Sequence, residues 1–518
     1  MNAADFLPTR FNVASYFVDR WASAGRGDRV AYRCDGRTLR YADLYDLVCR
    51  TGNALRELSV RMEDRVLIVC LDRPEFLGAF WGAIKIGAVP IPVNTLMRSG
   101  DFLHFLNDSR ARAAIVSAPL LDEVEPILGE APHLEHVLVA GGDPRGHRLF
   151  EEVVSRASPR LENAPTTRDD AAFWLYSSGS TGRPKGAVHL HHDMVVCYET
   201  FARQILGITE HDRVFSAAKL FFAYGLGNAG YFPLGAGAEA VLLADRPTPQ
   251  GVFELVARER PTLFFGVPTL YAGMLAIEDA EKRYDFSSVR LCVSAGEALP
   301  GDIFERWRRC FGVEIVDGIG TTEMLHIFLS NRPGACRPGS SGVPVPGYEA
   351  RIVDEEGRPV ERGEIGNLRV RGDSAMACYW NQHDRTKQAL YGPWLETGDK
   401  YRQDDAGYFW FCGRGDDMLK VSGIWVSPFE VESTLAEHPA VLEAAVVGRE
   451  DDDRLVKPAA FVVLKDPPNR SATLADDLKT FVKAKLAPYK YPRWIEFVAE
   501  LPKTATGKIQ RYKLRQSS

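Results

Sequence analysis

The sequence predicts an α/β protein with a large N-terminal part of several subdomains and a small C-terminal α/β domain. Short apolar runs with strand character alternate with helical patterns along the chain, as an α/β architecture requires. At 518 residues the chain is too long for a single core. The last hundred residues repeat the alternation on a smaller scale, after a glycine-rich stretch at 413–417.

The individual elements follow from the hydrophobic pattern. Residues 42–58 and 74–86 have helical spacing, and the apolar run 65–71 between them predicts a buried strand. Further strands are expected at 113–117, 136–140, 171–176, 213–217, 240–243, 263–266 and 290–293, with helices at 249–258, 269–278 and 301–310. The C-terminal part is expected to contain a strand at 418–421, a helix at 428–437, strands at 443–448 and 458–464, and a helix at 474–487.

Composition and charge narrow the class of protein. Hydrophobic residues make up 45% and charged residues 25%, as in a globular protein, and a net charge of −6 argues against general nucleic-acid binding. Nine cysteines are scattered with no C-x-x-C pair, which argues against a zinc site or a disulfide framework and for a reducing compartment.

No targeting or membrane segment is visible. Residues 1–21 lack the continuous apolar core of a signal peptide. The most apolar region, 76–97, is interrupted by Lys85, Pro90 and Pro92, so it does not qualify as a membrane span. We therefore expect a cytoplasmic protein without a membrane partner.

Residues 176–186 form the stretch with the clearest chemistry. Eleven residues contain three glycines, four aliphatic hydroxyls and the cations Arg183 and Lys185, directly after a predicted buried strand. Glycines let successive backbone N–H groups turn inward and cradle an anion. The G-x-x-x-x-G-K-[ST] frame of a Walker A loop is absent, which excludes that class of motor or kinase. A plain surface loop is the alternative, but the density of these residues after a strand favours a polyphosphate-binding loop.

This loop resembles the phosphate loop of the adenylate-forming superfamily, which includes acyl-CoA ligases, peptide-synthetase adenylation domains and luciferases. The resemblance implies that ATP phosphates contact Ser177, Ser178, Gly179, Ser180, Thr181, Gly182 and Lys185, with Thr181 and Lys185 also catalytic. Three histidines follow at 189, 191 and 192; metal ligation by them is disfavoured because only Asp193 lies nearby, and His191 resembles a structural histidine of the superfamily.

Three further segments resemble the nucleotide motifs of the superfamily. Residues 294–300 are similar to the adenine segment, implying contacts from Gly296, Glu297 and Ala298. Residues 317–327 match the Y-G-x-T-E motif, with Ile319 in place of the stacking tyrosine. They imply base contacts from Asp317, Gly318, Ile319 and Thr322, and a Mg²⁺ site at Glu323 together with Thr181. Residues 395–399 resemble the ribose motif, which implies that Asp399 and Arg414 hold the ribose.

The segment Phe221–Gly227 is aromatic and glycine-rich, a pattern that on its own more often means core packing. In the superfamily it lines the carboxylic-acid pocket. Ala223 stands where amino-acid-activating relatives usually place an aspartate, and an unpaired ammonium in a dry pocket would be costly, so an aromatic acid is favoured over an α-amino acid. The run is especially similar to the benzoate–CoA ligase family, which implies an aryl pocket of Phe222, Ala223, Tyr224, Ala295, Gly320, His326 and Ile327.

The C-terminal part carries the remaining motifs. Residues 413–417 resemble the hinge, with Asp416 as the pivot between an N-terminal adenylation domain (1–415) and a mobile C-terminal domain (416–518). Lys420, Gly423 and Trp425 resemble the coenzyme A tunnel, and Lys508 in the tail resembles the catalytic lysine.

Together these motifs imply an ATP-dependent, AMP-forming aryl-CoA ligase that uses ATP, Mg²⁺ and coenzyme A. The expected acid is benzoate, 2-aminobenzoate or a hydroxybenzoate, and a monomer or homodimer is expected. The alternative is a free-standing aryl-acid adenylation enzyme that loads a carrier protein, since it shares every nucleotide motif. A non-enzymatic binding module is disfavoured because Lys185, Glu323, Asp399, Arg414 and Lys508 are all present.

Overall fold

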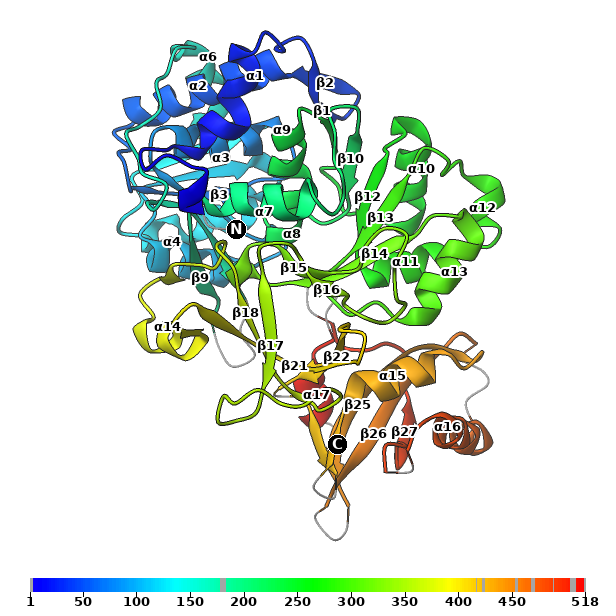
Figure 1. The fold of residues 1–518 in the computed structure, drawn as a ribbon. Helices are drawn as coiled ribbons and strands as arrows, with labels where there is room; N and C mark the ends of the chain where they lie inside the picture. Colours follow the sequence, from blue (N-terminus) through cyan, green and yellow to red (C-terminus); the bar gives the residue numbers. More distant parts are fainter. Residues whose placement is uncertain are drawn as a thin grey trace.

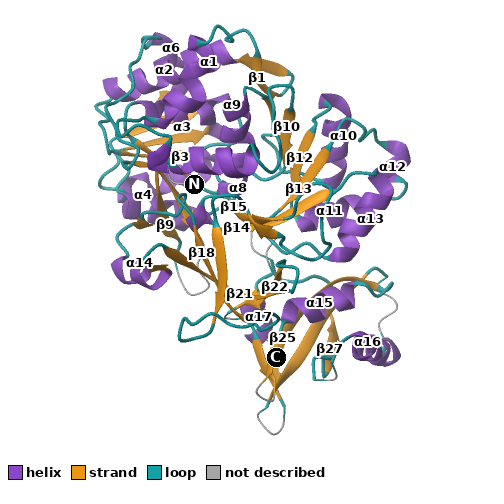
Figure 2. Ribbon diagram, in the orientation of Figure 1, coloured by secondary structure: helices purple, strands orange, loops and turns teal. Residues whose placement is uncertain are grey.

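The computed structural model describes residues 3–177, 183–415, 417–421, 424–451, 455–466, 471–487, 489–503 and 509–516. The N-terminal two-thirds of the chain form two large α/β layers side by side. A yellow antiparallel sheet lies below them, and the C-terminal unit, orange to red, lies below that (Figure 1). Helices and strands alternate throughout (Figure 2), so the α/β fold class is confirmed.

A nine-stranded sheet with the order β16-β15-β14-β13-β12-β10-β11-β1-β2 forms the centre of the molecule. Its inner strands are parallel and apolar on both faces, as expected of strands covered on both sides. Phe264 and Cys292 pack against the helix cluster of α10, α11 and α13, whereas Phe265 and Val293 face the opposite core. The strands are β1 Val30–Cys34, β2 Arg37–Arg40, β10 Arg213–Ser216, β11 Glu239–Leu242, β12 Leu263–Gly266, β13 Leu291–Ser294, β14 Ile315–Gly320, β15 Ile327–Ser330 and β16 Val343–Pro344. The helices are α10 Pro249–Glu259, α11 Pro268–Leu275 and α13 Gly301–Phe311.

A second, five-stranded sheet is entirely parallel, in the order β4-β3-β5-β6-β7. Ile68 and Ile115 join the main core, while Leu67 and Val116 pack against α4 on the other face. The elements are β3 Arg65–Val69, β4 Val89–Pro92, β5 Ala113–Ser117, β6 His136–Ala140, β7 Arg148–Leu149, α2 Tyr41–Glu57, α3 Pro74–Lys85 and α4 Ser99–Ser109.

Two antiparallel sheets complete the N-terminal region. One consists of β8 Ala171–Ser177, β9 Lys185–Leu190 and β19 Cys378–Tyr379, in the order β19-β9-β8. The other contains β17 Glu349–Val353, β18 Gly366–Arg371, β20 Leu390–Tyr391, β21 Trp394–Gln403 and β22 Phe409–Arg414, with α14 His383–Ala389 beside it.

The C-terminal unit has its own sheet and its own apolar core, which includes Val431, Leu435, Val446, Val462 and Leu478. A short hairpin (β23 Leu419–Val421 and β24 Ile424–Val426) precedes a three-stranded sheet of order β25-β26-β27. The remaining elements are α15 Pro428–Ala436, β25 Val441–Glu450, β26 Val456–Leu464, α16 Ala472–Lys485, β27 Trp494–Phe497 and α17 Arg511–Gln516.

Each strand and helix expected from the hydrophobic pattern is present within a few residues of its predicted bounds. The pattern missed the strands β1, β2, β4, β7, β9, β14–β22, β24 and β27. It also missed three π-helical turns, η2 Ser15–Asp19, η5 Tyr198–Ala202 and η6 Leu226–Tyr231. Minor helices are η1 Ala3–Asp5, α1 Arg20–Ser23, η3 Ala118–Leu120, α5 Leu121–Val124, η4 Glu125–Glu130, α6 Phe150–Arg156, α7 Asp193–Cys197, α8 Ala223–Gly225, α9 Phe232–Ala236, α12 Ala280–Arg283 and η7 Thr322–Met324.

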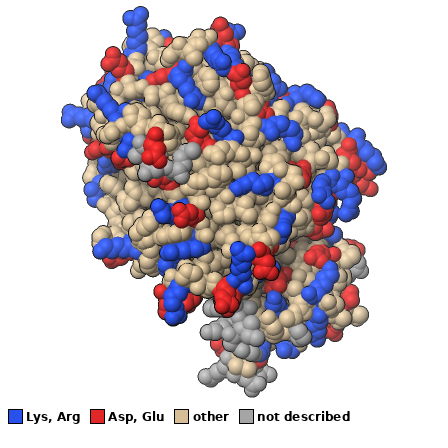
Figure 3. Space-filling model, in the orientation of Figure 1, with Lys and Arg blue, Asp and Glu red and all other residues tan. Residues whose placement is uncertain are grey.

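Two general expectations can be compared with the structure. Across the described residues, no helix is both long enough and apolar enough to cross a membrane. The cysteines are free thiols, most of them buried. Lys and Arg are interspersed with Asp and Glu over the face shown in Figure 3, and neither sign dominates that face.

Candidate active site

The carboxyl ends of parallel strands bring the predicted nucleotide segments together. β12, β13 and β14 run parallel, so the segment after β13 (294–300) and the segment after β14 (321–327) leave the same edge of the sheet. Ligands of open α/β sheets bind at this edge. Gly318 and Gly320 allow β15 to fold back on β14, because a Cβ at either position would lie 2.6 Å and 2.5 Å from the carbonyl oxygens of Leu329 and His326.

The predicted phosphate loop connects the two strands of a hairpin. Ser177 ends β8 and Lys185 begins β9, and the two residues are paired across the hairpin. Lys185 therefore projects from a strand rather than from the loop itself. The predicted residues Ser178, Gly179, Ser180, Thr181 and Gly182 lie outside the described part of the chain.

Glu323 lies at the centre of a polar cluster. Its Oε1 accepts hydrogen bonds from Ser177 Oγ at 3.0 Å and from Tyr379 Oη at 2.7 Å, and Lys185 Nζ lies 3.9 Å away. Lys185 Nζ also donates to Tyr379 Oη at 2.9 Å. Burial lowers the pKa of Lys185, Glu323 opposes that shift, and repulsion from Arg385 and Arg414 adds to it. The cluster therefore contains one carboxylate and the cations Lys185, Arg385 and Arg414. The repulsion among these cations favours the binding of an anion.

Tyr379 was not predicted from the sequence. It lies 194 residues after Lys185 and belongs to no motif that we identified. It reaches the cluster because β19 pairs with β9, with Tyr379 opposite Ala187. Burial, and then the charge of Glu323, raises the pKa of its phenol, so the hydroxyl remains a donor to the carboxylate.

His189 joins the phosphate hairpin to the Glu323 turn. Its Nδ1 lies 2.7 Å from Asp193 Oδ2 and its Nε2 lies 2.8 Å from the carbonyl oxygen of Thr322. His191 Nδ1 accepts from the backbone N–H of Val13, and burial lowers its pKa to about 4. No group of three or more metal-ligating side chains occurs among the described residues. The structure thus engages these histidines in packing and hydrogen bonds.

The adenine segment begins with a tight turn. Gly296 has φ +93°, a backbone conformation that favours glycine. Asp317 is buried on β14, where it is the register partner of Ser294, the last residue of β13 before this segment. Burial raises the pKa of Asp317 well above its usual range. Asp317 therefore lies next to the start of the segment, with a carboxyl group for which the protonated form is favoured. Glu297 is close enough to stabilise the charge of Arg511 in the C-terminal unit.

The predicted ribose residues are register partners on adjacent strands. Asp399 on β21 lies opposite Arg414 on β22, with Arg414 Nη1 at 2.9 Å from Asp399 Oδ1. The carboxylate is buried, whereas about half of the guanidinium side chain is exposed. Tyr401, on the same strand as Asp399, is buried and shares a hydrogen bond with Ser341 Oγ at 3.0 Å; burial, and then the charge of Asp399, raises the pKa of its phenol.

The predicted aryl pocket is organised around His326. A tight turn at Leu325 (φ +66°), closed by the His326 N–H to Met324 carbonyl bond at 2.8 Å, directs His326 back toward Tyr224 and Phe232. Asn228 Nδ2 donates to Ser216, so its Oδ1 accepts from His326 Nε2 at 3.1 Å. Burial lowers the pKa of His326 to about 3, so the imidazole is neutral.

The rest of this pocket is also uncharged. Tyr224 donates to the carbonyl oxygen of Val293 at 3.2 Å, which fixes its ring above β13. Ala295 directly follows that strand, and Ile327 pairs with Gly320. Phe222 and Ala223 are partly exposed at the start of α8. The predicted aryl residues thus gather at one end of β13 and β14 without a formal charge.

The C-terminal site residues are only partly described. Asp416, Gly423 and Lys508 lie outside the described residues, as do the side chains of Lys420 and Trp425, whose backbones pair across the β23–β24 hairpin. Lys503 and Ile509 flank the predicted lysine and form a β-bridge. Arg511 makes a bidentate pair with Glu432, with Nε donating to Oε1 at 3.1 Å and Nη2 to Oε2 at 2.7 Å, and it also approaches Asp417.

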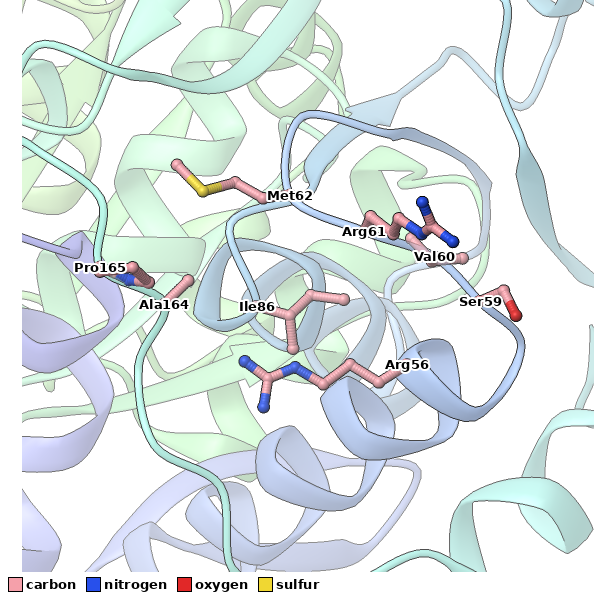
Figure 4. Close-up of a pocket in the computed structure, with 8 residues that line it drawn as sticks. All are labelled: Arg56, Ser59, Val60, Arg61, Met62, Ile86, Ala164 and Pro165. Carbon is pink, nitrogen blue, oxygen red and sulfur yellow. The ribbon is translucent and has the colours of Figure 1, made fainter.

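A separate cavity of about 410 Å³ lies elsewhere in the N-terminal region (Figure 4). Met62, Ile86 and Ala164 form its apolar wall, and Arg56 extends beneath Ile86. It contains none of the predicted site residues, so we assign no part of the site to it.

Comparison with known proteins defines the class. The AMP-binding enzyme family model matches residues 18–380, and the model of the AMP-binding enzyme C-terminal domain matches residues 430–508. The chain belongs to this family, which is the adenylate-forming superfamily that its motifs resemble.

Individual relatives within this family indicate the class of acid more closely. The chain is 54% identical over 513 residues to a benzoate–CoA ligase of Thauera aromatica, covering 99% of this chain and 97% of that protein. The anthranilate CoA ligase AuaEII, solved in complex with anthranoyl-AMP, superposes with a TM-score of 0.96 at 44% identity, covering 100% of this chain and 99% of that one. A benzoate CoA ligase from Burkholderia xenovorans LB400 superposes with a TM-score of 0.90 at 48% identity, covering 98% of this chain and 100% of that one.

Proposed function

We propose that this chain is an ATP-dependent, AMP-forming ligase that joins a benzoate-class acid to coenzyme A. The observation that carries the proposal is the meeting of two groups at the carboxyl ends of β13 and β14. One is the charged cluster of Lys185 and Glu323, and the other is the uncharged aromatic group around His326. The cluster suits phosphates, and the neutral pocket suits an aryl ring. Whole-length similarity to a benzoate–CoA ligase agrees with this function.

The acid is benzoate or a benzoate with a small ring substituent, such as 2-aminobenzoate or a hydroxybenzoate. Ala223 and the neutral His326 offer no charge to pair with an α-ammonium group. An aromatic amine is neutral near pH 7 and needs no such partner. The similarity to ligases of benzoate and of anthranilate supports this range of acids.

Glu323 fits a hard divalent cation. The hydroxyls of Ser177 and Tyr379 both donate to its Oε1, and within the described residues no hydrogen bond reaches its Oε2. A Mg²⁺ ion held by Glu323 and Thr181 would neutralise charge on the β- and γ-phosphates of ATP.

The remaining residues have roles in positioning and charge stabilisation. Lys185 and the hydroxyl-rich loop hold the departing pyrophosphate, while Asp399 and Arg414 hold the ribose. Lys508 bridges the acid carboxylate and the α-phosphate, so that a carboxylate oxygen attacks phosphorus in line and pyrophosphate leaves. The products of this half-reaction are aryl-AMP and pyrophosphate.

The second half-reaction requires a rearrangement. We place the boundary between the N-terminal and C-terminal domains at residues 415 and 416, with Asp416 as the pivot. Rotation there withdraws Lys508 and brings the segment of Lys420, Gly423 and Trp425 to the adenylate. The thiol of coenzyme A then attacks the acyl carbon, and AMP leaves.

A substrate panel tests this function. Purified protein is incubated with ATP and Mg²⁺, with and without coenzyme A, and products are read by mass spectrometry. The acids are benzoate, 2-aminobenzoate, the hydroxybenzoates, cyclohexanecarboxylate, phenylacetate and a fatty acid. We expect aryl-CoA and AMP only with coenzyme A present, and best with one benzoate. Aryl-AMP that accumulates regardless of coenzyme A would instead indicate loading of a carrier protein.

A further inference from the structure

The hydroxyl of Tyr379 lies between the two charged groups of the polar cluster. It donates its single proton to Glu323 Oε1 at 2.7 Å and accepts from Lys185 Nζ at 2.9 Å. The ammonium and the carboxylate remain 3.9 Å apart, farther than a direct hydrogen bond allows. They are therefore bridged by a neutral group rather than joined as a direct ion pair.

This arrangement determines which oxygen of Glu323 is available. Ser177 and Tyr379 both donate to Oε1, so the carboxylate is held by two hydroxyls on one side. Among the described residues, no hydrogen bond reaches Oε2. If Lys185 moved onto Glu323, the direct ion pair would compete with any cation for the same carboxylate.

Tyr379 is itself held firmly. Its backbone pairs with β9 opposite Ala187, and its N–H donates to Thr386 Oγ1 on α14 at 3.0 Å. Its ring lies 4.1 Å from Lys185 Nζ, so the ring and the hydroxyl both define the position of the ammonium. The hydroxyl can thus act as a fixed spacer.

We propose that Tyr379 is a positioning residue whose hydroxyl keeps Lys185 off Glu323 and so preserves the divalent-cation site on that carboxylate. The inference rests on the proposed ligase function, and it adds a residue that lies outside the motifs identified in the sequence. Tyr379 acts through Glu323 and Lys185 and takes no part in bond making.

The test is the Mg²⁺ dependence of ATP-analogue binding in Tyr379→Phe. This variant keeps the ring over Lys185 and removes only the hydroxyl. The dissociation constant of α,β-methylene-ATP is measured by calorimetry over a series of Mg²⁺ concentrations. Because a hydrogen bond to a charged group is worth about tenfold or more in an equilibrium, we expect the Mg²⁺ midpoint to rise by about tenfold. An unchanged midpoint would overturn the inference.

Tyr16→Phe is the matched control. Tyr16 Oη donates to Glu199 Oε1 at 2.6 Å, again a phenol bound to a glutamate carboxylate, and neither residue belongs to a predicted site segment. Its loss should leave the Mg²⁺ midpoint unchanged, and an equal shift in both variants would mean a general effect on folding. Thioester formation from supplied aryl-AMP should also be unchanged in Tyr379→Phe.

A double variant isolates the spacing role. In a Lys185→Met background there is no ammonium to move onto Glu323, so adding Tyr379→Phe should cause little further shift of the midpoint. Additive shifts would overturn the spacer role. Failure of the proposed function has a different signature: the unaltered protein itself would show no acid-dependent exchange of pyrophosphate into ATP.

Discussion

Arg414 and Asp399 form an ion pair in which the burial of the two partners is unequal. Their nearest atoms are 2.9 Å apart, with the carboxylate almost fully buried and the guanidinium side chain about half exposed. Gly398, between Thr397 and Asp399, adopts φ +75°, a backbone conformation that favours glycine, and it lies next to the guanidinium. Arg414 therefore both orients the proposed ribose-binding carboxylate and presents its own donors outward.

Removal of this guanidinium should weaken nucleotide binding. We expect Arg414→Met to raise the KM for ATP by about tenfold or more, because a charge-assisted hydrogen bond to Asp399 is lost and the carboxylate is left poorly compensated. The KM for the acid should change little. Steady-state kinetics with either substrate varied measures this difference.

Arg402→Met is the control for that change. Arg402 lies on the same strand as Asp399 and stacks on Trp410 with its guanidinium carbon 5.4 Å from the ring centroid. It should leave the KM for ATP unchanged. Equal effects of both substitutions would contradict a specific role for Arg414.

A methyl group at Gly227 should block the aryl pocket. A Cβ there would lie 2.3 Å from His326 Cδ2 and 2.6 Å from its Nε2. We expect Gly227→Ala to displace His326 and to reduce kcat/KM for the acid by about 10- to 100-fold, since overpacking costs about 1–3 kcal/mol. Initial rates over a range of benzoate concentrations measure the loss.

Gly230→Ala, in the same helical turn, is the control for Gly227→Ala. The added Cβ would meet the flexible end of Leu226 at 3.0 Å and would lie in ordinary contact with Leu220 Cδ2 at 3.6 Å. Turnover should be retained. If Gly230→Ala were as damaging as Gly227→Ala, the effect would belong to the helix and not to His326.

Lys508→Ala should separate the two half-reactions. We expect the rate of adenylate formation, measured as pyrophosphate exchange into ATP, to fall by about 100-fold or more. The reason is that a positive charge that stabilises the transition state is lost. Thioester formation from supplied aryl-AMP should be largely intact. Equal loss in both assays would refute the role assigned to Lys508.

Asp416→Pro should affect the opposite half-reaction. Proline fixes φ, so it should trap one orientation of the C-terminal domain and suppress thioester formation. Single-turnover measurements with preformed aryl-AMP follow this step. Unchanged turnover would count against Asp416 as the pivot.

Asp72 should make stability depend on pH. Burial raises its pKa to about 6, against the opposing effects of Lys219 and of the Leu220 N–H group, which it binds at 3.2 Å. A raised carboxyl pKa in the folded state favours the protonated form. Its stabilising contribution is therefore complete below the unfolded value of about 3.9 and is lost as the pH rises through about 6.

Asp72→Asn removes that dependence. The difference in Tm, variant minus unaltered protein, should increase from about pH 4 to about pH 7. This increase corresponds to a change of at most about 3 kcal/mol in the free energy of unfolding. Thermal unfolding at several pH values measures the difference. Asp46→Asn, which alters an exposed carboxylate paired with Arg50, should show no such trend. A flat difference for Asp72→Asn would contradict the proposed titration.

The sequence predicted much of the fold because the parallel strands are buried on both faces. Such strands appear in the sequence as continuous apolar runs, which are easy to recognise. For this reason β5, β6 and β12 begin and end at their predicted residues. Edge and antiparallel strands such as β4 or β19 are too short to show a period of their own. Their pairing depends on residues distant in the chain.

The same division holds for the site. Resemblance to the motifs of the adenylate-forming superfamily identified Lys185, Glu323, His326, Asp399 and Arg414 as candidates, and their side chains are of the types that phosphate, metal and ribose binding require. Three features appear only in three dimensions: the Tyr379 bridge, the His189 link to Thr322 and the buried position of Asp317. They depend on strand pairing and burial, which bring together residues up to 194 positions apart and set their charge states. The sequence by itself determined which chemical groups are present, and the tertiary structure decided which of them touch, because distance and desolvation are properties of the folded chain.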